Sequence, residues 1–394
     1  MRPRRVIALA ALTLVLGCGG SVARSAATGA RVRGLVVAVV SAPGESRHSW
    51  LEAATLEGRR RHHVTPRRGQ SEDRADFDPA VSPDGRRVAF VRRRASGDSL
   101  WVVRLDGSGP RVVLEESQLQ TLLSGALELR SPAWSPDGKT LTAVVDEANG
   151  DCRSDGLIAV SVDGLERNVL VRLAQSTHTY LTSAGWDPRG RSVAYVATSN
   201  DGCREVDGFR SVLSVVSADG SRQRRLGASD GWTYSAAWSP TGRWIALDGD
   251  CGGCNLYLAN ADGSGYRQLV PVDDLAEGFS FGWWKNKVIY TRSRRSVFVV
   301  DPRKNAHSRL LKLPCARPSA RRCAPVVELD ASSPTAAVFD LGTWTSTSAF
   351  EVVSLPHTSV RRLPGPRALR RSDHVVGFVV ALAGGAAAVG IGSS

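Results

Sequence analysis

The stretch SPAWSPDGKTLTAVV (Ser131–Val145) decides the fold, because the chain repeats it. Its centre, Pro-Asp-Gly, has the residue types of a tight turn: Pro presets φ, Asp bonds the neighbouring backbone and Gly accepts a positive φ. An apolar segment ending at Trp134 precedes the turn, and a β-type run follows it. Three near-copies share this plan: DPAVSPDGRRVAFVR from Asp78, TSAGWDPRGRSVAYVA from Thr182 and YSAAWSPTGRWIALDG from Tyr234.

The repeat predicts units of four antiparallel strands, which we name A to D. The glycines of the A–B turn stand at positions 85, 138, 190 and 242, a regular spacing that is typical of a repeat fold. A second turn, Asp-Gly, separates strands C and D at positions 106–107, 163–164, 219–220 and 262–263. Since the strands keep their length and the B–C connection varies, we expect a constant scaffold with variable loops on one side.

Trp-Ser-Pro-Asp-Gly followed by a β run resembles the WD40-like (PD40-type) repeat of TolB-like β-propeller proteins, and it also occurs in the propellers of prolyl-oligopeptidase-type enzymes. The resemblance implies an all-β fold, a β-propeller of four-stranded blades. Counting the units predicts seven blades, with six or eight as alternatives; TolB-like domains typically have six. The repeats are expected near residues 34–65, 78–114, 130–171, 182–227, 233–270, 278–313 and 325–363.

The first unit has candidates for strands B, C and D but none for strand A. We expect the C-terminal segment 374–392 to supply that strand, so that pairing of the N- and C-terminal strands closes the ring and leaves no exposed sheet edge. The rival interpretation treats Val375–Ile391, which holds no charged residue, as a membrane helix.

The N-terminal sequence, MRPRRVIALAALTLVLGCGG, has the basic start and the apolar run of a bacterial export signal. Val15-Leu16-Gly17-Cys18 resembles the lipobox of bacterial lipoproteins, which implies that Cys18 carries lipid. We therefore expect a signal peptide over residues 1–17, a lipidated tether over 18–33 and a propeller over 34–394. The protein would then be exported and lipid-anchored to the extracytoplasmic side of the cell membrane.

The formal net charge is +13. An exported chain has no routine access to nucleic acid, so its basic balance indicates anionic lipid headgroups or acidic envelope polymers as weak partners. Arginines cluster only in RRRHHVTPRR (Arg59–Arg68) and RQRR (Arg222–Arg225). We expect a monomer that binds a protein or an anionic envelope polymer.

Six cysteines remain once Cys18 is set aside, an even number that favours disulfides outside the cytoplasm. The expected pairs are Cys152–Cys203, Cys251–Cys254 and Cys315–Cys323. Cys251-Gly-Gly-Cys254 also allows a redox pair, and the four cysteines of the B–C loops allow a zinc site. An oxidising compartment disfavours zinc, and we predict no metal or cofactor.

Other motifs with possible chemistry are isolated. Gly227-Ala-Ser-Asp-Gly231 matches Gly-x-Ser-x-Gly, but a nucleophile elbow needs a strand before it and a helix after it, and this copy lies between two strands. His62-His63 is a lone doublet. The segments DEANGDCRSDG from Asp146 and TSNDGCREVDG from Thr198 lack the register of a known calcium loop. We predict no catalytic residue.

The variable B–C loops are the predicted binding face, because recognition usually resides on loops that a rigid scaffold carries. We predict a non-enzymatic, envelope-anchored TolB-like propeller that binds a protein or envelope polymer there. The alternative is an enzyme or small-ligand binder that acts at the central channel. The binding-face candidates are Arg153, Asp155, Arg204, Glu205 and Asp207.

Overall fold

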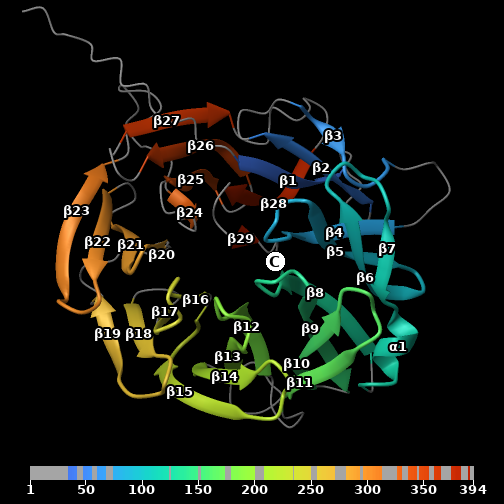
Figure 1. The fold of residues 1–394 in the computed structure, drawn as a ribbon, viewed down its shortest axis with the longest axis horizontal. Coiled ribbons are helices and arrows are strands. Elements are labelled where there is room, and N and C mark those ends of the chain that lie inside the picture. The colour runs from blue at the N-terminus through green and yellow to red at the C-terminus, as the bar shows by residue number, and fades with distance from the viewer. Residues whose placement is uncertain are drawn as a thin grey trace, which may run out of the picture. The chain divides into compact units, whose positions relative to one another are not determined.

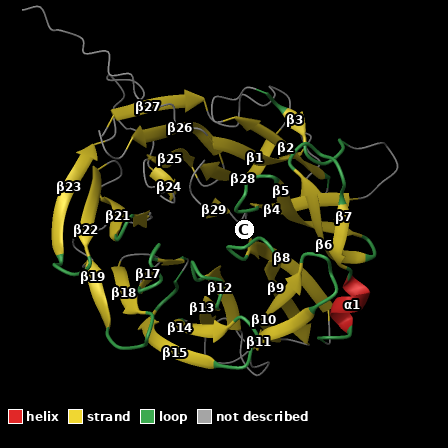
Figure 2. Cartoon of the chain, viewed as in Figure 1, coloured by secondary structure: helices red, strands yellow, loops and turns green. Residues whose placement is uncertain are grey.

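The computed structural model divides the chain into two units, Met1–Arg31 and Val32–Ser394. The structure describes residues 34–41, 48–55, 60–67, 74–123, 126–149, 152–173, 179–199, 208–233, 235–249, 255–270, 281–292, 296–312, 326–330, 336–343, 346–354, 359–364, 374–382 and 389–390. These residues are almost entirely β-strand, joined by short turns and one short helix (Figure 2). All belong to the second unit.

Strands that follow one another in the chain pair antiparallel in groups of four, which we call sets (Figure 1). Set 1 holds β28 (His374–Leu382), β1 (Gly34–Ser41), β2 (Ser49–Thr55) and β3 (His62–His63). Set 2 holds β4 (Arg74–Val81), β5 (Arg87–Arg94), β6 (Gly97–Arg104) and β7 (Arg111–Leu114). Set 3 holds β8 (Ala126–Trp134), β9 (Thr140–Asn149), β10 (Cys152–Ser161) and β11 (Arg167–Arg172).

The later part of the chain follows the same order. Set 4 holds β12 (Thr179–Trp186), β13 (Ser192–Ser199), β14 (Arg210–Ser217) and β15 (Gln223–Asp230). Set 5 holds β16 (Ala236–Trp238), β17 (Trp244–Gly249), β18 (Asn255–Asn260) and β19 (Tyr266–Val270). Set 6 holds β20 (Phe281–Trp284), β21 (Lys287–Arg292), β22 (Ser296–Asp301) and β23 (Ala306–Lys312), and set 7 holds β24 (Val326–Asp330), β25 (Ala336–Thr343), β26 (Ser346–Ser354) and β27 (Ser359–Pro364).

The C-terminal strand joins the first set, as the sequence predicts. Strand β28 pairs antiparallel with β1, from Gly34 opposite Leu382 to Ser41 opposite His374. The short strand β29 (Val389–Gly390) pairs with β28 on the edge opposite β1. Among the described residues, no helix has the length and apolar character needed to cross a membrane.

The A–B turns share one backbone design. In set 2 the N–H of Gly85 donates to the carbonyl of Ser82 at 2.8 Å, and Gly85 has a φ of +69°. This left-handed conformation favours glycine because it has no Cβ. Gly138, Gly190 and Gly242 repeat the bond and the positive φ, which confirms the predicted turns.

The apolar core lies between successive sets. Buried side chains form five clusters among the described residues, and each cluster joins two neighbouring sets from set 1 to set 6. Indole N–H groups cross the same boundaries: Trp134 donates to the carbonyl of Ala80 at 2.9 Å and Trp238 to that of Gly185 at 3.0 Å. Trp134 and Trp238 therefore pack and bond one set to the one before it, in the way that neighbouring units of a repeat fold complete one another's core.

Two local features differ from the sequence prediction. The segment from Asp146, expected to be a loop, is mostly strand, because β9 and β10 continue pairing until Asn149 lies opposite Cys152. A one-turn helix, α1 (Glu116–Gln120), joins sets 2 and 3, where we expected none. Its capping box links Glu115 and Gln118, a spacing that is legible in the sequence.

Candidate binding site on the loop face

The two ends of each set differ in what they carry. Because the strands alternate in direction, the A–B and C–D turns meet at one end, which we call the turn face. The B–C and D–A connections meet at the other end, which we call the loop face. The predicted binding residues belong to the loop face.

Asp155, predicted to be exposed on the loop face, is buried. It is 2% exposed, and its carboxylate pairs with the guanidinium of Arg130 and accepts the backbone N–H of Leu181. Burial raises the pKa of Asp155 from 3.8 to about 6, an effect that the charge of Arg130 only partly offsets. The prediction was wrong for this residue because the hairpin of set 3 is longer than expected and turns Asp155 toward set 4.

Asp155 belongs to a recurring contact at the start of strand C. In set 2, Asp98 accepts the N–H of Leu129 on β8 at 3.0 Å, and Arg93 binds the same carboxylate through two hydrogen bonds of 2.9 Å. In set 4, the hydroxyl of Ser211 accepts the N–H of Thr233 at 3.0 Å. Each contact fixes the chain that enters the next set, so the loop face has a rigid frame.

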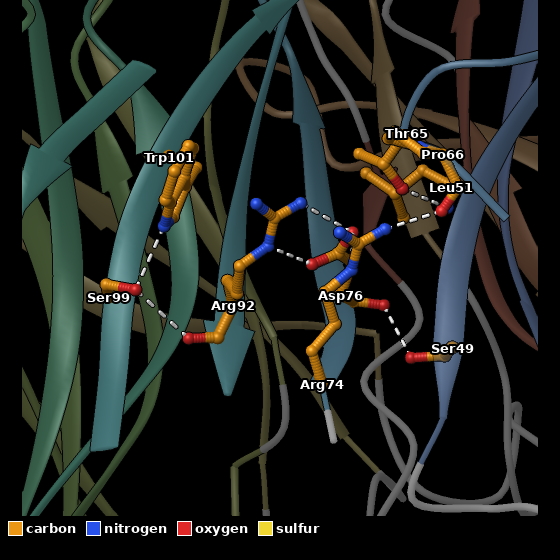
Figure 3. Close-up of polar contacts among 9 residues, drawn as sticks. All are labelled: Ser49, Leu51, Thr65, Pro66, Arg74, Asp76, Arg92, Ser99 and Trp101. Carbon is orange, nitrogen blue, oxygen red and sulfur yellow. Dashed lines mark hydrogen bonds and ion pairs between the residues drawn. The ribbon is translucent and has the colours of Figure 1, made fainter. Parts of the chain in front are cut away.

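A buried ion pair extends this frame to sets 1 and 2 (Figure 3). Arg92 donates to both carboxylate oxygens of Asp76, at 2.6 and 2.9 Å, and its guanidinium lies 4.4 Å from the ring centre of Trp101. The Asp76 carbonyl accepts the hydroxyl of Ser49 at 2.7 Å. Arg74 lies on the same carboxylate, with 3.8 Å between Nε and Oδ2. The charged groups of Arg74, Asp76 and Arg92 contact one another, so we assign them a structural role.

Three aromatic side chains meet at the loop end of set 4, and we call them the aromatic cluster. Tyr180 is the second residue of β12, Phe209 precedes β14, and Trp232 follows β15. The Trp232 ring centre lies 5.6 Å from that of Tyr180 and 4.8 Å from that of Phe209, which meets it edge-on. All three side chains are half-buried. They form an apolar patch at the loop end of set 4 that is partly exposed to solvent.

Exposed charges flank the aromatic cluster. Arg210 lies directly opposite Asp230 in the pairing of β14 with β15, and both side chains are exposed. The insertion that carries Arg204, Glu205 and Asp207 begins after Ser199 and ends before Gly208, next to Phe209. The sequence pattern indicated that insertion but gave no sign of the aromatic residues beside it.

The remaining predicted site residues lie outside the described part of the structure. These are Cys18, Cys203, Arg204, Glu205, Asp207, Cys251, Cys254, Cys315 and Cys323. The backbone of Cys152 and Arg153 lies in β10, but their side chains are outside the described residues too. The disulfide and lipidation assignments stay predictions.

The Gly-x-Ser-x-Gly match does not form a nucleophile elbow. Ser229 lies within strand β15 and is 7% exposed, and the segment continues to the aromatic cluster and β16 without a helix. His62 contacts the carbonyl of Leu105 at 2.8 Å through Nε2. Nowhere in the described ranges do three His, Cys, Asp or Glu side chains gather as a metal site would require.

Comparison with known proteins agrees with a propeller fold. Residues 54–150 match the family model described as the lipoprotein LpqB beta-propeller domain. Tricorn protease homolog 1 of Streptomyces coelicolor is 28% identical over 202 residues, 50% of this chain and 17% of that protein. Uncharacterized peptidase YuxL of Bacillus subtilis is 23% identical over 206 residues, 43% of this chain and 29% of that protein. The chain thus spans less than a third of these curated relatives.

Solved structures lead to the same fold. An oligogalacturonate lyase in complex with manganese has a TM-score of 0.56 at 13% identity, over 84% of this chain and 86% of that one. An acylaminoacyl peptidase complex has a TM-score of 0.55 at 18% identity, over 85% of this chain and 51% of that one. At such identities the likeness concerns the fold alone. The predicted resemblance to propeller proteins, a lipoprotein propeller domain included, is confirmed.

Proposed function

We propose that this protein is a non-enzymatic, envelope-anchored β-propeller whose loop face binds another protein. The observation that carries the proposal is the aromatic cluster of Tyr180, Phe209 and Trp232, half-buried at the loop end of set 4. Aromatic side chains, with arginine, are enriched at protein interfaces, where they add much contact area at a small cost in conformational entropy. Arg210 and Asp230 beside the cluster supply a polar rim.

The rigid frame supports the same proposal. Asp98, Asp155 and Ser211 each hold the backbone of the following set, so loops on this face are carried by a fixed base. A preorganised surface loses less conformational entropy on binding. We further propose that sets 1 to 7 are seven blades of one ring, closed through the pairing of β28 with β1.

The N-terminus and the matched family support the proposed location of the protein. The lipobox-like sequence before Cys18 and the match of residues 54–150 to a lipoprotein propeller domain both support an anchor on the extracytoplasmic side of the cell membrane. The partner would then be an envelope protein. An acidic envelope polymer is the competing partner, and the following experiment distinguishes the two.

The test is chemical crosslinking in intact envelopes followed by purification of the protein. Replacing both Phe209 and Trp232 with Ala should abolish recovery of the crosslinked partner. The matched control is Leu165→Ala, which truncates a side chain that is 80% exposed in a turn of set 3 and should leave recovery unchanged. Thermal unfolding of each variant separates lost binding from lost folding.

Three outcomes count against the proposal. If the Phe209 and Trp232 variant is folded and still recovers the partner, the loop face is not the binding site. Loss of the partner from the Leu165 variant would lead to the same conclusion. Recovery of carbohydrate or another polymer in place of a protein, with the same dependence on Phe209 and Trp232, would keep the site and overturn the partner class.

A further inference from the structure

The turn face carries a basic side chain at the same position in four consecutive sets. The residue that follows each A–B turn glycine is Arg86, Lys139, Arg191 or Arg243, and all four are exposed. Over sets 2 to 5, the four A–B turns hold six basic residues and three acidic ones. The C–D turns of the same face add one aspartate each (Asp106, Asp163, Asp219 and Asp262), with the basic residues Arg104, Arg167 and Arg222 close to them. The fold does not require a positive charge at this position, because the conformation of the turn depends on the glycine before it.

The acidic side chains of this face are engaged within their own turns. Asp84 accepts the hydroxyl of Ser82 at 2.5 Å, and Asp137 accepts that of Ser135 at 2.6 Å. These hydrogen bonds lower the pKa of both carboxyls. None of the four basic residues forms an ion pair with a carboxylate of the described residues. All four side chains are exposed, and the guanidinium of Arg243 lies 5.3 Å from the ring centre of Trp244.

Contacts between neighbouring sets make the turn face continuous. Arg87 donates to the carbonyl of Gly138 at 2.9 Å, which links the A–B turns of sets 2 and 3. Asn168 donates to the carbonyl of Asp219 at 2.7 Å, which links set 3 to the C–D turn of set 4. The basic positions thus lie on one surface.

The chain enters its first strand from this same face. In set 2 the first residue of strand B, Arg87, pairs with the last residue of strand C, Arg104, at the turn end. Strand β1 takes the place of strand B in set 1, and Leu35 near its start pairs with Thr55, the last residue of β2. The segment that joins Cys18 to Gly34 therefore reaches the fold at the turn face. Sixteen residue steps span at most about 55 Å when extended.

A shallow recess on the turn face adds a place for an anionic group. An open pocket of about 620 Å³ lies between sets 1 and 2 and is lined by His62, Arg86, Arg87 and Arg104. Asp84 and Asp106 also line it, and Asp106 accepts the hydroxyl of Ser108 at 2.6 Å. Three guanidinium groups outnumber the two carboxylates. A lipid phosphate fits this balance of charge.

We propose that the turn face docks on the anionic phospholipid surface of the membrane and leaves the loop face pointing away from it. The inference rests on the lipid anchor of the proposed function, because a tether that enters at the turn face keeps that face close to the bilayer. Several basic residues near an anionic surface bind additively, and a tether raises their effective concentration there. Each of the four turn positions contributes one charge to this attraction.

The test is hydrogen–deuterium exchange of the full chain, purified from its host and mixed with vesicles of phosphatidylcholine alone or with phosphatidylglycerol. We expect turn-face peptides that contain Arg86, Lys139 or Arg191 to exchange several-fold more slowly with the anionic vesicles. Peptides that contain Phe209 or Trp232 should exchange at the same rate with both. High salt should remove the difference, since it screens surface charge.

Matched variants isolate the charge. Changing Lys139, Arg191 and Arg243 to Glu should abolish the protection. Changing Arg94, Arg225 and Arg309 to Glu alters the net charge equally on exposed positions within strands and should preserve it. Equal turn-face exchange with both vesicles, or equal behaviour of the two variants, would overturn the proposal. Protection by soluble polyglutamate but not by the anionic vesicles would replace the membrane with an acidic polymer.

This experiment separates the two proposals. If the anchor is wrong, the chain will not associate with phosphatidylcholine vesicles at all. If only the docking is wrong, the chain will associate with both kinds of vesicle and its turn-face peptides will exchange alike. Neither result depends on the loop-face partner.

Discussion

The carboxylate of Asp155 holds the backbone N–H of Leu181, the third residue of the first strand in the following set. The same carboxylate pairs with Arg130 on the first strand of its own set. One buried acid thus joins two sets at the loop face, and its charge is removed from water.

Stability should depend on pH through Asp155. Its folded pKa of about 6 lies above the ordinary value of 3.8, so its contribution is present below about pH 4 and is lost as the pH rises through 6. The difference is on the order of 2–3 kcal/mol. Asp155→Asn keeps an acceptor for Leu181 and removes the titration. Denaturant unfolding at pH 4 and pH 7 should therefore show wild type losing more stability than the variant, and equal changes would refute the assignment.

The indole hydrogen bonds between sets should be measurable one by one. Trp134→Phe leaves the Ala80 carbonyl without its donor and should cost about 1–3 kcal/mol of unfolding free energy. Trp186 occupies the same position in set 4, but its buried Nε1 makes no hydrogen bond. Trp186→Phe should thus cost less. A larger loss for Trp186→Phe in urea unfolding would mean that packing, and not the hydrogen bond, decides the effect.

The turn aspartates should titrate unusually low. Asp219 accepts hydrogen bonds from the Ser217 hydroxyl and from the backbone and hydroxyl of Ser221, which lower its pKa to about 2. Replacing both serines with Ala should move that pKa upward, toward 3.8. Carboxyl chemical shifts followed by NMR between pH 1.5 and 6 give the answer directly. An unchanged midpoint in the double variant would contradict the hydrogen-bond explanation.

The cysteine assignment is open to peptide mapping. Digestion without reductant should recover linked peptides that contain Cys152 with Cys203, Cys251 with Cys254, and Cys315 with Cys323. Mass spectrometry of the same sample should find lipid on the N-terminal peptide that begins at Cys18. Six free thiols, or one zinc per chain, would show that the disulfide prediction is wrong.

The sequence predicted what local chemistry determines. Turn glycines such as Gly85 and tryptophans such as Trp134 could be predicted because they recur at the same position of the repeat. The pairing of β28 with β1 could be predicted because the first repeat lacks a strand A of its own. The aromatic cluster was not predictable in this way. Tyr180, Phe209 and Trp232 lie outside the repeated phrase and meet only after three connections of set 4 have folded.

The sequence also did not predict which single charged side chains are buried. Asp155 stands in a polar segment that reads as a solvated loop, and only the continued pairing of β9 with β10 turns it inward. Hairpin length depends on contacts with the neighbouring set, such as the bridge between Ser154 and Thr179. Those contacts join residues that no repeat pattern links.

The central claim is that the two faces have different tasks, the loop face toward a protein and the turn face toward the membrane. A photo-crosslinking amino acid placed at Phe209 or at Arg191 in intact cells tests it most directly. The account predicts a protein adduct from position 209 and, from position 191, lipid adducts without that protein. A protein adduct from position 191, with none from position 209, would contradict it.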